Sequence, residues 1–174
     1  MPNQATTSPD AQPTHLIDPA RALLRHAVAT VAYRAAKTVR DTPERFAGFV
    51  AGPTTRTPEQ ILAHMVDLFD WALTMARGPT RWHDSSILPW DEQLRRFFAS
   101  LEAFDAYLAS GEPLTTSAER LFQGPVADAL THVGQLAMLR RLAGGPVRGE
   151  SYAKADITAG RTSFDQPAPR VEFD

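Results

Sequence analysis

Three residues of metal-binding types are spaced so that a helical protein could bring them together. Asp128 and His132 are four residues apart, and side chains four positions apart on a helix share one face, with Cβ atoms roughly 5–6 Å apart. A divalent ion about 2.0–2.2 Å from each donor atom fits between such a pair. His64 recurs with the apolar residues of its own segment, so we expect its imidazole to point inward. This pattern predicts a metal site at His64, Asp128 and His132, of the kind that helical bundles build from facing side chains.

The same residues also fit an ordinary structural role. Asp128 follows the pair Gly124-Pro125, which we interpret as a helix start, and an acid in the first turn is stabilised by the helix dipole. His132 would then be a hydrogen-bonded histidine of the core. Spacing alone leaves both interpretations open.

Other residues are candidates for supporting such a site. A histidine that binds a metal usually donates its second ring N–H to a carboxylate or carbonyl oxygen. Asp67 and Gln135 lie three residues after His64 and His132 respectively, so either could orient a ring. Asp67 is equally well explained as a solvated helix acid. The remaining candidates for a pocket are Trp71, His83 and Tyr152.

Four amphipathic segments, punctuated by Gly and Pro, must position these residues. Asp18 before Pro19 is typical of a helix start, and Thr57 three residues before Gln60 forms a capping box. The predicted helices are 18–40, 58–77, 91–110 and 125–143. Four such helices bury their apolar stripes against one another, so we expect an all-α four-helix bundle. The long connection after the second helix permits either an up-down-up-down order or a crossover.

Composition is that of a globular chain. Hydrophobic residues make up 43% of the 174 residues, and the formal net charge is −2, which gives no reason to expect nucleic-acid binding. Cysteine is absent, which fits a cytoplasmic protein. We find no signal peptide and no apolar run of the ~20 residues that span a membrane. We expect a flexible arm at 1–16, the bundle at 17–160 and a C-terminal tail at 161–174.

The segments around the two histidines resemble a known family. The run HVGQLAMLRRLAG at 132–144 and the run ILAHMVDLFDW at 61–71 are similar to the histidine helices of the DinB/YfiT-like superfamily. The likeness covers about residues 18–160. It implies a four-helix bundle, often dimeric, that binds a divalent metal through three histidines. His64 and His132 match the first and last of these, whereas Asp128 stands where the family has the middle histidine.

That departure has a chemical consequence. A carboxylate adds one negative charge, so the metal should be a weaker Lewis acid, and Ni, Fe or Mn become acceptable beside Zn. The resemblance implies a metal-dependent transferase or hydrolase acting on a small molecule, with a low-molecular-weight thiol as a second cofactor. The alternative is a non-enzymatic helical stress-response or binding protein with a vestigial site. We also expect a homodimer, because Trp82, Ile87 and Trp90 lie in a connection with little core of its own.

Overall fold

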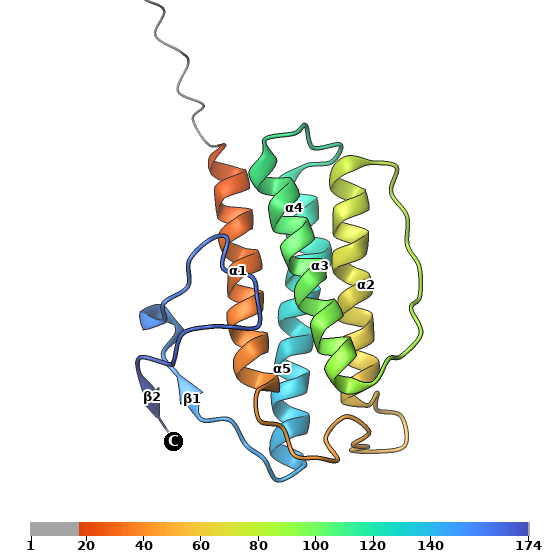
Figure 1. Cartoon of the computed structure of the whole chain (residues 1–174), viewed down its shortest axis with the longest axis vertical. Helices are drawn as coiled ribbons and strands as arrows, with labels where there is room; N and C mark the ends of the chain where they lie inside the picture. The colour runs from red at the N-terminus through yellow and green to blue at the C-terminus, as the bar shows by residue number, and fades with distance from the viewer. Residues whose placement is uncertain (1–17, 174) are drawn as a thin grey trace, which may run out of the picture.

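The fold is dominated by helices that run the length of the molecule. The computed structural model describes residues 18–173, so the predicted arm at 1–16 lies outside the described residues. The helical elements are α1 (Pro19–Val39), α2 (Pro58–Arg77), α3 (Trp90–Ser110), α4 (Ala118–Leu121), the π-helical η1 (Phe122–Val126) and α5 (Ala127–Leu142). Since α4, η1 and α5 form one continuous helix, the predicted all-α four-helix fold is confirmed (Figure 1). Within residues 18–173, no helix is both long and apolar enough to cross a membrane.

The first two helices begin where the sequence predicts. The Asp18 carboxylate accepts a hydrogen bond from the Ala20 N–H at 3.0 Å, which caps α1. At α2, the Thr57 N–H donates to the Gln60 side chain at 2.8 Å and the Gln60 N–H donates back to the Thr57 hydroxyl at 3.4 Å. This reciprocal capping box satisfies two amides that have no partner inside the helix.

The predicted start of the fourth helix at Pro125 is wrong. The helix begins at Ala118, where the Ser117 hydroxyl accepts from the Arg120 N–H, and Pro125 lies inside it. Proline has no N–H, and its ring would clash with the carbonyl four residues earlier in an α-helix. The chain accommodates this by widening into a π-helix over Phe122–Val126. Consequently Asp128 is not at a helix start, and the interpretation of Asp128 as a first-turn acid loses its basis.

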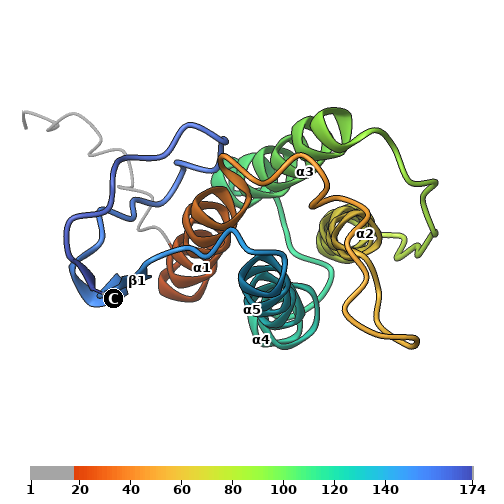
Figure 2. The same ribbon diagram turned by 90° about the horizontal axis from the view of Figure 1, so that it is seen from below.

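The helices occupy four corners of the bundle. Each of α1 and α2 packs against α3 and α5, and α1 and α2 lie diagonally opposite each other (Figure 2). Figure 1 shows α1 and the α4–η1–α5 helix running one way and α2 and α3 running the other. The connection 78–89 therefore returns along the whole bundle, so the crossover order is the one adopted.

The C-terminal segment is fastened to the outer face of α1. Short strands β1 (Gly149–Glu150) and β2 (Glu172–Phe173) pair antiparallel, on either side of the turn η2 (Tyr152–Lys154). Buried Glu150 accepts hydrogen bonds from the Tyr33 hydroxyl at 2.7 Å and from the Lys37 ammonium at 2.8 Å. Lys37 also donates to Glu172 of β2 at 2.8 Å, so the described part of the predicted tail packs against the bundle through the same lysine.

Arg140 closes one end of the bundle. Its buried guanidinium donates to the backbone carbonyls of Thr38, Arg40, Asp41 and Gly145. Three of these carbonyls end α1 or follow it, and the fourth follows α5. One side chain therefore ties the ends of two helices together by satisfying carbonyls that the helices leave free.

Candidate metal centre

The structure brings the three predicted ligands together between α2 and α5. His64 Nε2 lies 3.6 Å from one carboxylate oxygen of Asp128, and His132 Nε2 lies 3.5 Å from the other. The two imidazole rings stand nearly perpendicular, with centroids 4.9 Å apart. One ligand atom from each residue falls within 4.8 Å of the others, so the group can hold a metal ion.

These separations fit the size of a divalent ion. An ion about 2.1 Å from each donor, at a tetrahedral angle, places neighbouring donors about 3.4 Å apart. The two histidine-to-carboxylate distances, 3.6 and 3.5 Å, are close to that value. Two imidazole nitrogens and one carboxylate oxygen suit Zn, Fe, Ni or Mn. The Asp128 side chain is 46% exposed, so the group opens to solvent on that side.

The protonation state of His64 favours metal binding. Burial lowers the pKa of His64, and the neighbouring His132 and Arg56 lower this pKa further, while Asp128 opposes them. A lowered pKa keeps the imidazole neutral at neutral pH, and only the neutral ring offers a lone pair to a metal. The surroundings of His64 thus prepare it as a ligand.

Gln135 holds the His132 ring, as its position predicts. His132 Nδ1 lies 2.8 Å from Gln135 Oε1. An amide oxygen only accepts hydrogen bonds, so Nδ1 is the donor in this contact, and a neutral ring with this tautomer has its lone pair on Nε2. It is Nε2 that faces Asp128. This is the outer contact that metal-binding histidines usually make.

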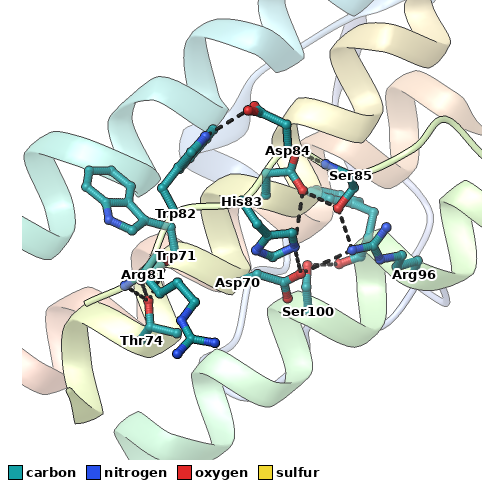
Figure 3. A network of polar contacts seen from close by, with 12 residues as sticks. Asp70, Trp71, Thr74, Arg81, Trp82, His83, Asp84, Ser85, Arg96 and Ser100 are labelled. Atoms are coloured by element: carbon teal, nitrogen blue, oxygen red, sulfur yellow. Dashed lines mark hydrogen bonds and ion pairs between the residues drawn. The ribbon is translucent and has the colours of Figure 1, made fainter. Parts of the chain in front are cut away.

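Asp67 does not orient His64 but belongs to a second polar group. Its carboxylate accepts hydrogen bonds from the N–H and the hydroxyl of Ser85. His83 Nε2 lies 3.6 Å from Asp67 and 3.4 Å from Asp70. Arg96 of α3 donates to the Ser85 hydroxyl at 2.6 Å and lies 3.4 Å from Asp70 (Figure 3).

This second group has the right residue types for a metal but a different role. Asp67, Asp70 and His83 also place ligand atoms within 4.8 Å of one another. However, the Asp67 oxygens already accept from Ser85, and the Arg96 cation offsets the acidic charge. The group therefore fastens the connection 78–89 to α2 and α3. Asp67 and His83 were predicted as separate candidates. No pattern in the sequence indicates that the crossing connection places His83 beside Asp67.

Fastening this connection places Trp82 beside the candidate metal centre. The Trp82 ring lies 5.6 Å from the His64 ring and 5.7 Å, edge to face, from the Trp71 ring (centroid distances). The Trp82 indole N–H donates to Asp84 at 3.2 Å (Figure 3). Trp71, one of the predicted pocket candidates, thus forms an apolar wall with Trp82 next to His64.

Two other predicted residues take different positions. Tyr152 lies against α1, where its ring meets Tyr33 edge to face and stacks under the Arg34 guanidinium. Trp90 packs edge to face on Phe46, 5.6 Å away. Trp82 of the connection and Trp90, the first residue of α3, thus both have aromatic partners within the chain. They therefore give no reason to expect a second copy, and the homodimer stays a prediction.

A pocket of about 480 Å³ lies next to His132. This volume is within the range of about 300–1,000 Å³ that small-molecule sites occupy. The pocket is lined by Ala51, Thr55, Arg56, Ile61, His132, Gln135, Met138, Leu139 and Leu142. His132 and Gln135 thus face the pocket and the candidate metal centre alike.

Comparisons with known proteins add no relative. The chain matches no family model, no curated protein and no solved structure. The resemblance to the DinB/YfiT-like superfamily therefore rests on the segments that carry His64 and His132, and membership in that superfamily stays a prediction.

Proposed function

We propose that this chain is a metal-dependent enzyme of the DinB-like type, a transferase or hydrolase that acts on a small molecule. The observation that carries the proposal is the convergence of His64, Asp128 and His132. The two imidazole nitrogens lie 3.6 and 3.5 Å from opposite oxygens of one carboxylate. The hydrogen bond from His132 to Gln135 supports it, because outer partners of this kind fix the ring and raise its basicity.

Each residue then has a defined part. His64 and His132 bind the ion as neutral ligands, and Asp128 binds it as an anion that offsets part of its charge. Such an ion, when bound, supplies Lewis-acid chemistry, lowering the pKa of a water or thiol ligand. The ring of Trp82 beside His64 excludes water from one side. On the family resemblance, a low-molecular-weight thiol is the proposed second cofactor.

Zinc titration of purified protein against a chromophoric chelator tests the proposal. Asp128→Ala should lower zinc affinity by at least about 100-fold, the upper end of what losing an outer partner costs. Asp128→His should retain binding with three nitrogen ligands. The matched control is Asp165→Ala, at an exposed aspartate outside both polar groups, which should bind zinc like the wild type.

Two results would contradict the proposal. If Asp128→Ala bound zinc as tightly as the wild type, at most a two-histidine site would remain. If the zinc-loaded protein neither hydrolysed activated esters nor transferred a thiol to an activated aryl halide, and His64→Ala behaved identically, the non-enzymatic alternative would be favoured.

A further inference from the structure

The pocket beside His132 has aliphatic walls that are open to solvent. Met138 and Leu142, on successive turns of α5, are 57% and 59% exposed, and both line the pocket together with Ile61 of α2. Large apolar side chains exposed in this way on one concave surface often mark a binding site. The walls contain no Phe, Tyr or Trp side chain, so they suit an alkyl chain better than a flat ring.

The one formally charged side chain lining this pocket is Arg56. It lies immediately before the α2 cap, Thr57, and it lines the same pocket as His132 of the candidate metal centre. Arg56 forms no ion pair with any of residues 18–173. An arginine without an acidic partner beside an apolar wall is complementary to a carboxylate that carries an apolar chain.

The charges near the pocket also favour an anion. The carboxylate of Asp128 and the guanidinium of Arg56 carry opposite formal charges. A bound divalent ion would leave a local excess of positive charge that attracts an anion and repels a cation. Carboxylate binding should therefore be tighter in the metal-loaded protein.

We propose that this pocket binds a medium-chain aliphatic carboxylate. The carboxylate group lies against Arg56, and the alkyl chain lies along Met138 and Leu142. This inference rests on the proposed function, for which it names the class of substrate. The residues by which it is tested, Arg56, Met138 and Leu142, are not metal ligands, so the two can be tested separately.

Calorimetric titration of zinc-loaded protein, with no free zinc, tests the inference with octanoate as the probe. Octanol and octylamine are the neutral and cationic controls of equal length. Octanoate should bind more tightly than either. Arg56→Gln should weaken octanoate binding about fivefold, as expected for a solvent-exposed charge pair, and leave octanol binding unchanged. Arg45→Gln, at an exposed arginine of the same connection, is the matched control and should change nothing.

The variants Met138→Ala and Leu142→Ala test whether the apolar walls of the pocket contribute to binding. Each variant should weaken the binding of octanoate and the binding of octanol to the same extent, because each removes apolar contact rather than charge. Since both side chains are more than half exposed, these variants should fold, which circular dichroism checks. Equal binding of octanoate and octanol, together with no effect of Arg56→Gln, would overturn the inference by showing a non-specific apolar surface. A dimer that Met138→Ala dissociates would overturn it in favour of a second copy.

Failure of this inference is distinguishable from failure of the proposed function. A protein that binds zinc through Asp128 but does not bind octanoate would refute the carboxylate pocket alone. A protein that binds octanoate through Arg56 but binds no zinc would keep the pocket and refute the metal-dependent function. Repeating the octanoate titration on chelator-treated protein shows whether the pocket binds without zinc, and we expect weaker binding there, while the zinc titration shows separately whether the metal binds.

Discussion

His132 and Gln135 lie one turn apart on α5, and Nδ1 of the histidine is 2.8 Å from Oε1 of the glutamine. Because this contact fixes which ring nitrogen carries the proton, Gln135→Ala should lower zinc affinity about tenfold, the lower end of the range for an outer partner. Chelator competition measures the change. Gln123→Ala, at an exposed glutamine of η1, is the control and should bind zinc normally. Equal affinities of the two variants would show that Gln135 does not position His132.

Replacing Arg140 should lower the free energy of unfolding far more than replacing the adjacent Arg141. Arg140→Met removes donors from four backbone carbonyls and should cost about 3 kcal/mol of unfolding free energy, the upper range for hydrogen bonds to a charged group. Arg140→Lys should not retain the stability of the wild type, because an ammonium cannot reproduce the planar, forked hydrogen-bond geometry of a guanidinium. Urea unfolding measures these differences. Arg141→Met, at the adjacent exposed position, is the control, and equal losses in both would contradict the role of Arg140.

The contribution of the C-terminal segment to stability should decrease at acid pH because of Glu172 in β2. The hydrogen bond from Lys37 lowers the pKa of the Glu172 carboxyl below its usual 4.5. An acid with a lowered folded-state pKa contributes stability above its unfolded-state pKa and loses it as the pH falls through the folded-state pKa. The wild type should therefore be more stable than Glu172→Gln at neutral pH, and the difference should shrink below pH 4.5.

Thermal unfolding of both proteins across this pH range measures the effect. Glu102→Gln, at an exposed glutamate of α3, should unfold like the wild type at every pH. A difference between wild type and Glu172→Gln that did not depend on pH would show that the ion pair with Lys37 is not its source.

We expect the predicted homodimer to form through a surface other than the connection between α2 and α3. Ile87 is 46% exposed on the connection, whereas Leu23 of α1 and Phe122 of η1 are 71% and 48% exposed and line a common groove. We expect sedimentation to give a species of twice 19.1 kDa, and Leu23→Gln to dissociate it while Ile87→Gln does not. The reverse ranking would return the interface to the connection, and a single 19.1 kDa species would refute the dimer.

Local signals made most of the bundle predictable. The start of α2 is predictable because the bonds between Thr57 and Gln60 join residues three apart. The start of α1 is predictable because the bond between Asp18 and Ala20 joins residues two apart. The metal group was predictable for a similar reason. Asp128 and His132 share a helix face, and His64 follows the apolar stripe of its own helix.

Features set by distant parts of the chain were not predictable. Nothing in the spacing distinguishes Arg140, which binds four carbonyls, from the exposed Arg141 beside it. The contact between Ser85 and Asp67 depends on a crossing connection that has no periodic pattern. Pro125 was misleading for a physical reason, since proline usually breaks an α-helix but is tolerated where the helix widens.

That widening decouples two parts of one helix. In an α-helix each residue advances the side-chain direction by about 100°, so one residue added anywhere would swing every later side chain onto another face. The π-helical turn at Phe122–Val126 takes up such a residue within a single turn. The orientation of Asp128 and His132 is therefore set separately from the face by which α4 meets α1. Loss of one residue at that turn would therefore restore a regular α-helix without turning His132 away from α2.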